Sequence, residues 1–121
     1  MDEILKHIQE NANFVAEKFE LGFNEETIKF LEGFIERQRA RTPGERFEGL
    51  INTLGSFLGE CIIRNFGGTW VQEEDGTIGL KFTGNERAFP FTKVEKQFQN
   101  GLEDSIYSFY TVIPKFFKLE K

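Results

Sequence analysis

The stretch 54-LGSFLGECIIRNFGGTW-70 decides how this chain folds, because it joins a long run of helical spacing to the start of a different period. Apolar residues recur every three or four positions through this stretch and the segment before it: Phe47, Leu50, Ile51, Leu54, Leu58, Cys61 and Ile62. Such spacing predicts a long amphipathic helix that ends near Asn65. We expect the helix to begin at Thr42, which would cap it, with Pro43 at the first helical position and Glu45 completing a capping box.

Small residues form a second pattern on the same predicted helix. Gly55 and Gly59 are four residues apart and share one face, which Asn52 and Ser56 extend into a small-residue strip. Each glycine costs a helix interior about 1 kcal/mol relative to alanine, so the strip needs a compensating contact. We interpret it as a surface against which other parts of the fold pack. A ligand lying against the bare backbone is the alternative.

At Gly67 and Gly68 the helical period gives way to a strand period. These glycines follow a helix and precede a strand, which is the reverse of the order in phosphate-binding loops. Strands are predicted at 69–74 and 77–82, joined by Asp75-Gly76 as a two-residue type I′ turn that sets Val71 opposite Leu80. A third strand is expected from Arg87 to Phe91, with Pro90 marking its end.

Helices are predicted on both sides of these strands. Before them, one helix runs from Asp2 towards Gly22 and a second runs from an Asn24 cap to about Ala40. After them, helices are expected at 92–99 and 103–113, with Pro114 ending or kinking the last one. We therefore predict one α+β domain over residues 1–121: helices, a three-stranded antiparallel meander, and two C-terminal helices.

Composition and charge exclude several classes of function. The 121 residues are 39% hydrophobic and 29% charged, which is typical of a globular domain, and fifteen of them are phenylalanine. Residues 1–60 hold seven Lys or Arg against twelve Asp or Glu, and this half accounts for the formal charge of −5. We therefore do not expect nucleic acid to be a partner. A single cysteine and the lack of an apolar run near 18 residues predict a cytoplasmic protein without a membrane partner.

One candidate binding cleft follows from the central helix. Glu60 and Arg64 are four residues apart, and a cleft between this helix and the hairpin would contain both of them together with Trp70. Glu60 could then act as a binding or general-base carboxylate held by Arg64. The alternative is an ordinary surface ion pair. His7 and Cys61 are far apart in the sequence and show no metal-ligand spacing, so we predict no metal, no cofactor and no catalytic residue.

A second candidate site is a group of arginines near the end of the second helix. Arg37, Arg39 and Arg41 could form a patch for an anion or an acidic partner. The alternative is that they interact with the carboxyl end of the helix and with nearby glutamates.

Residues in the second half resemble a family of small bacterial domains of unknown function. The resemblance covers about 50–112 and includes a Gly-x-x-x-Gly-Glu helix, a Gly-Gly-x-Trp strand entry, a Phe-Pro and Lys-Val segment, and an Asn-Gly-x-x-Asp-Ser helix before an aromatic pair. It implies a bacterial α+β domain and transfers no activity.

The favoured function is a non-catalytic module that binds another protein or a second copy of itself, as immunity or accessory proteins do. Acidity and a high phenylalanine content motivate this hypothesis, because surplus phenylalanine leaves an exposed apolar patch. The alternative is a small-molecule binder or enzyme that uses the cleft at Glu60 and Arg64.

Overall fold

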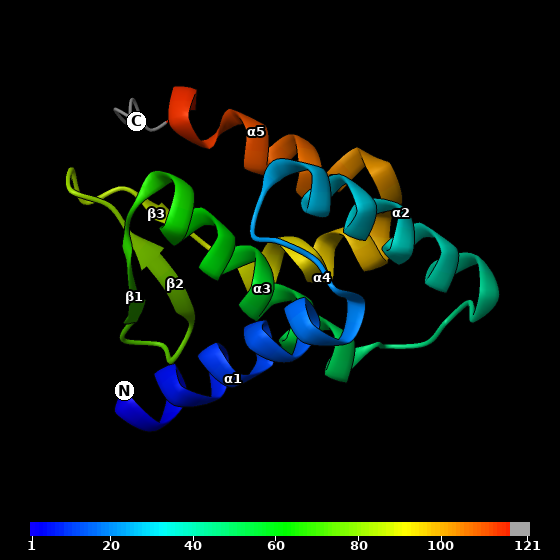
Figure 1. Ribbon diagram of the computed structural model, residues 1–121, viewed down its shortest axis with the longest axis horizontal. Helices are drawn as coiled ribbons and strands as arrows, with labels where there is room; N and C mark the ends of the chain where they lie inside the picture. Colours follow the sequence, from blue (N-terminus) through cyan, green and yellow to red (C-terminus); the bar gives the residue numbers. More distant parts are fainter. Residues whose placement is uncertain (117–121) are drawn as a thin grey trace.

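The computed structural model describes residues 1–116, and its centre is the long helix α3 (Glu48–Phe66). Figure 1 shows α1 (Asp2–Phe19) crossing below α3, while α4 (Pro90–Asn100) and α5 (Ile106–Phe116) lie beside and above it. The apolar positions of α3 supply much of the core: Leu54, Phe57, Leu58, Cys61 and Ile62 are at most 1% exposed. The predicted helix is therefore confirmed, and the other elements pack around it.

The start of α3 differs from the prediction. The chain turns at 42–44, and the helix begins only at Glu48, after Phe47 in a left-handed conformation with φ 58°. Thr42 instead closes α2 (Glu25–Arg41), since its backbone N–H donates to the carbonyl of Gln38. Phe47 stacks on Phe98 with ring centroids 4.6 Å apart. The later start of α3 is therefore accompanied by the contact between Phe47 and Phe98, and the predicted capping box of Thr42 and Glu45 does not form the helix start.

The two N-terminal helices form where the apolar spacing predicts them. Asn24 caps α2 by accepting the backbone N–H of Thr27 at 2.9 Å, as expected. The end of α1 is earlier than predicted, because Glu20 and not Gly22 takes the left-handed conformation. Inward residues of α1 and α2 join the core: Ile8, Ala12, Val15, Ile28, Leu31 and Ile35.

The sheet is an antiparallel meander in the order β1-β2-β3, formed by β1 (Thr69–Gln72), β2 (Ile78–Lys81) and β3 (Arg87–Ala88). Its register is one residue away from the prediction, since Trp70 pairs with Leu80 and Val71 pairs with Gly79. Glu73 N–H bonds the Thr77 carbonyl, and Gly76 adopts φ 91° as the last residue of a three-residue loop. The extra loop residue brings Trp70 and Leu80 to the same buried face.

The C-terminal part adds a feature that the prediction lacked. The third strand stops at Ala88 because Pro90 is the first residue of α4. A short 3-10 helix, η1 (Gly101–Asp104), precedes α5, and Ser105 caps α5 by accepting the Ser108 N–H at 3.0 Å. Helix α5 continues through Pro114 to Phe116 instead of ending before it.

A buried polar junction ties α2 to the C-terminal elements. The side chain of Gln97 is fully buried; it donates to the Glu32 carbonyl at 3.1 Å and to Glu36 Oε2 at 2.9 Å. Its own carbonyl oxygen accepts the Ile106 N–H at 2.9 Å, and Ser105 donates its hydroxyl to Glu32. The α+β architecture is confirmed over residues 1–116, with α2 fixed to the core by these polar contacts.

Candidate functional site

The small-residue strip on α3 is covered by two aromatic rings where its glycines lie. A Cβ atom added to Gly59 would meet Trp70 Cη2 at 2.1 Å, and one added to Gly55 would meet Phe91 Cδ1 at 2.4 Å. Such distances leave no room for a side chain. The packing interpretation is therefore confirmed at both glycines, with β1 and α4 supplying the rings that replace the missing side chains.

Glu60, Arg64 and Trp70, the residues of the predicted cleft, contact one another through the carboxylate of Glu60. Trp70 Nε1 donates to Glu60 Oε2 at 2.9 Å, and Arg64 Nη2 lies 3.8 Å from Glu60 Oε1. The carboxylate is only 7% exposed, so both of its oxygens face groups of the same fold. The Arg64 guanidinium also lies 3.6 Å from the ring centroid of Phe23. This arrangement braces β1 and the α1–α2 connection against α3, and it resembles a packing device more than a reactive carboxylate.

Cys61 lies on the buried side of α3, next to Tyr110. Its sulfur is 3.7 Å from the Tyr110 hydroxyl and 3.6 Å from Asn65 Nδ2. Burial raises the pKa of the Cys61 thiol to about 11 and also raises the pKa of Tyr110. The thiol is therefore protonated at neutral pH and is a poor nucleophile.

The three predicted arginines separate onto two sides of α2. Arg39 turns inward, where Nε donates to the Phe98 carbonyl and Nη1 to Glu36, at 2.9 and 2.8 Å. Arg37 and Arg41 are four residues apart on the outer side. The Arg37 guanidinium lies 5.7 Å from the ring centroid of Phe30. Neither Arg37 nor Arg41 has an ion-pair partner within residues 1–116.

A pocket of about 700 Å³ opens between α4 and the segment that joins α2 to α3. Phe47 and Phe98 contribute its apolar surface, and charged residues of both signs surround them: Arg39, Glu45, Arg46, Glu48 and Glu95. Because two arginines and three glutamates line it, this pocket does not favour one sign of ligand charge.

A second pocket of about 480 Å³, the α1–hairpin pocket, lies between α1, α3, β2 and the start of α4. Its polar lining consists of His7, Asn11, Asn52, Ser56, Thr77 and Thr92. Its apolar lining consists of Ile4, Ile8, Ile78 and Phe91. The predicted cleft also lay between α3 and the hairpin, but Glu60, Arg64 and Trp70 do not line this pocket.

Sequence reasoning found Asn52 and Ser56 only as members of the small-residue strip and missed Asn11 and Thr92. These four residues belong to three helices that are distant in the sequence. Their convergence depends on how α1 and α4 dock on α3, and no local pattern encodes it.

Metal binding finds no support in the described residues. Within residues 1–116 there is no group of three or more histidine, cysteine, aspartate or glutamate side chains that could hold a metal ion. His7 is paired with Glu10, with 3.6 Å between Nδ1 and Oε1. No helix in the same range combines the length and hydropathy that a membrane-spanning helix requires.

Comparison of the chain with protein-family models, with curated proteins and with solved structures finds no match. The resemblance to small bacterial domains therefore stays a prediction.

Proposed function

We propose that this protein is a non-catalytic cytoplasmic module that binds another protein through the outer side of α2. The contact surface is the α2 outer stripe, defined as Phe30, Phe34, Arg37 and Arg41. These positions are spaced by four, three and four residues and so lie along one side of the helix. The buried residues Ile28, Leu31 and Ile35 occupy the adjoining inward side, and Phe34, at the border between the two sides, is half-buried.

The observation that carries the proposal is that exposed phenylalanine rings lie beside arginines without a carboxylate partner. Phe30 is 43% exposed, and Phe19 of α1 extends the stripe by an edge contact with Phe34, with ring centroids 6.0 Å apart. Arg37 and Arg41 have no carboxylate partner in the part of the chain that the structure describes. Aromatic residues and arginine are the residue types that dominate binding energy at protein interfaces.

The charge of the stripe indicates the chemistry of the partner. Two unpaired guanidinium groups beside apolar rings fit a segment that presents carboxylates next to an apolar side chain. A symmetric dimer through this stripe would instead place Arg37 and Arg41 near their own copies. Like-charge repulsion therefore favours a different protein over a second copy. An immunity-like or accessory role is one form of this function, and a toxin gene beside this gene would point to it.

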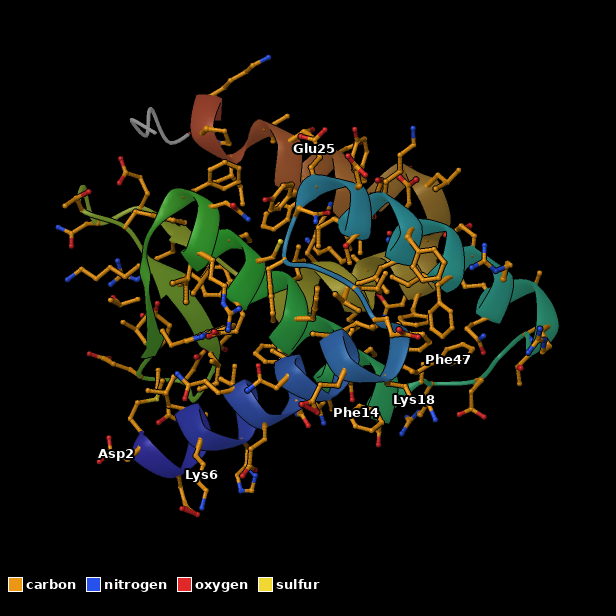
Figure 2. The ribbon with its side chains drawn as sticks, in the orientation of Figure 1. Asp2, Lys6, Phe14, Lys18, Glu25 and Phe47 are labelled. Atoms are coloured by element: carbon orange, nitrogen blue, oxygen red, sulfur yellow. The ribbon has the colours of Figure 1, made fainter. Side chains whose placement is uncertain are left out.

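Another exposed phenylalanine provides a comparison. Phe14 is 57% exposed on α1, and Figure 2 shows it with Lys18 on the lower side of α1, away from α2. Its helical neighbours Glu10 and Glu17 are acidic and exposed. Phe14 is therefore surrounded by one lysine and two glutamates, a mixed charge that does not favour an acidic partner, and we expect its truncation to matter less than truncation of Phe30.

The test is quantitative affinity capture from lysate of the native cells, followed by binding of the purified partner. We expect Arg37→Glu with Arg41→Glu to reduce capture of a specific acidic partner at least tenfold. The matched control, Lys81→Glu with Lys96→Glu, changes the net charge equally at exposed positions of β2 and α4 and should leave capture unchanged. Equal capture of every specific partner by both double variants, or capture of none by the unaltered protein, would overturn the proposal.

A further inference from the structure

The α1–hairpin pocket differs from the rest of the surface in its lack of charge. Lysine, arginine, aspartate and glutamate are all absent from its ten lining residues, although these four types make up 29% of the chain. His7 is the one titratable side chain in the lining. By contrast, the pocket beside α4 is lined by five charged residues.

Several polar groups in the α1–hairpin pocket remain free to bind a ligand. The side-chain amides of Asn11 and Asn52 and the hydroxyl of Thr92 make no hydrogen bond within residues 1–116. The Ser56 hydroxyl donates to the Asn52 carbonyl at 2.8 Å, so its oxygen is left as an acceptor. Donors and acceptors from α1, α3 and α4 therefore converge on one space, and that space is large enough for a small organic molecule.

One apolar wall of the pocket is fixed by the small-residue strip. Phe91 lines the pocket, and its ring also lies against the bare backbone of Gly55. A second ring, that of Trp70, is 5.7 Å away between centroids. Packing against Gly55 and Trp70 therefore fixes the Phe91 ring before a ligand binds. Less conformational entropy is then lost on binding.

We propose that the α1–hairpin pocket binds an uncharged small molecule that has an aromatic or alicyclic body and hydrogen-bonding groups. The body packs against Phe91, Ile8 and Ile78, while polar groups on the ligand reach the asparagine amides and the Thr92 hydroxyl. A charged ligand would find no lysine, arginine or carboxylate in this lining, and His7, its one titratable side chain, already faces Glu10. The inference does not depend on the proposed partner, because the pocket uses no residue of α2.

The probes for the test are benzamide, benzoate and benzamidinium, which share a ring and a planar substituent but are neutral, anionic and cationic. Binding is followed by amide chemical shifts of the 15N-labelled full chain. We expect benzamide to produce saturable shifts at Asn52, Ser56 and Ile78, with a Kd in roughly the millimolar range that suits so small a ligand. Benzoate and benzamidinium should bind at least tenfold more weakly.

Two asparagines on α1 give a matched pair of variants. Asn11 lines the pocket, whereas Asn13 is exposed and does not. We expect Asn11→Phe to weaken benzamide binding at least tenfold by filling the space and Asn13→Phe to change it less than twofold. Circular dichroism checks that both variants fold, and Asn52→Trp, at an exposed helix position that lines the pocket, replaces Asn11→Phe should that variant unfold.

Three results would overturn the inference. The first is that benzamide shifts no pocket amide saturably. The second is that a charged probe binds as tightly as benzamide. The third is that the pocket-filling variant and Asn13→Phe bind benzamide equally well.

Discussion

The two halves of the small-residue strip on α3 have different surroundings. At Gly55 and Gly59 the bare backbone is covered by the rings of Phe91 and Trp70, so this half is closed. At Asn52 and Ser56, less than one helical turn away, the same face borders an open pocket. Both halves carry small side chains, and the difference lies in what the rest of the fold places opposite them.

This difference shows how one helix face can serve both packing and binding. Aromatic rings fit closely only where no Cβ atom stands in the way, and a glycine provides that space. Asparagine and serine keep polar groups that are better left near water or a ligand. The closed half should therefore be intolerant of substitution. In the open half Asn52 is exposed and should be tolerant, whereas Ser56 is buried.

The largest expected effect is that of Gly59→Ala. The added methyl group would stand 2.1 Å from Trp70 Cη2, and the indole cannot move easily because Glu60 holds its N–H. We expect a loss of about 2 to 3 kcal/mol in the free energy of unfolding, measured by urea denaturation, after the gain in helix propensity is subtracted.

Gly49→Ala is the matched control for this change. Gly49 lies in the same helix, but a Cβ atom there meets nothing within 4 Å. Alanine should therefore stabilise the protein by about 0.5 to 1 kcal/mol. If both substitutions shift stability in the same direction, close packing at Gly59 is not what distinguishes the two halves.

The next largest effect should come from Trp70→Phe. This change retains a ring over Gly59 but removes the donor to Glu60, leaving a carboxylate that is 7% exposed without its closest partner. We expect a cost of about 1 to 2 kcal/mol in urea denaturation. A double-mutant cycle with Glu60→Met, which removes the acceptor, measures the coupling, and a coupling near zero would show that the brace contributes only packing.

The buried thiol on α3 predicts a pH dependence. The Cys61 pKa is raised from 9.0 to about 11 in the folded chain, so folding disfavours the thiolate. Its contribution to stability is complete below about pH 9 and is lost as the pH rises towards 11, which amounts to about 1 kcal/mol at pH 10. Tyr110, whose pKa is also raised, acts in the same direction.

Urea denaturation at pH 8 and pH 10 checks this expectation. Cys61→Ala should flatten the fall in stability between these two values, whatever its effect at pH 8. An unchanged fall would assign the alkaline sensitivity to other groups, with Tyr110→Phe as the next variant to measure.

The smallest effect is expected at the open half, from Asn52→Ala. The Asn52 side chain is exposed and has no protein partner in residues 1–116, so stability should change by less than about 0.5 kcal/mol. Benzamide binding, in contrast, should weaken. A stability loss as large as that of Gly59→Ala would remove the distinction between the two halves.

Local patterns predicted the parts of the fold that depend on periodicity. The apolar spacing in α1, α2 and α3 identified these helices because one side of each is buried. The role of Gly55 and Gly59 was also predictable, since glycine inside a helix has a known cost. The identity of the rings that cover them was not, because Trp70 and Phe91 reach α3 only through the tertiary fold.

Two of the wrong predictions share a physical cause, which is that long-range packing overrode a local signal. Asp75-Gly76 fits a two-residue turn, yet the three-residue loop that forms brings Trp70 onto the buried face. Thr42, Pro43 and Glu45 fit a helix start, yet α3 begins after Phe47, whose ring stacks on Phe98. The candidate pocket could not be predicted at all, because its lining comes from four separate elements.

The contact between Phe91 and Trp70 has a practical consequence. Trp70 is the sole indole of the chain, and its ring lies next to the residue that forms a wall of the α1–hairpin pocket. Ultraviolet emission from this protein therefore originates mainly beside that wall. A molecule that shifts Phe91 on entering will alter the colour or intensity of the emitted light, so a library of unlabelled compounds can be screened by fluorescence on the unmodified protein.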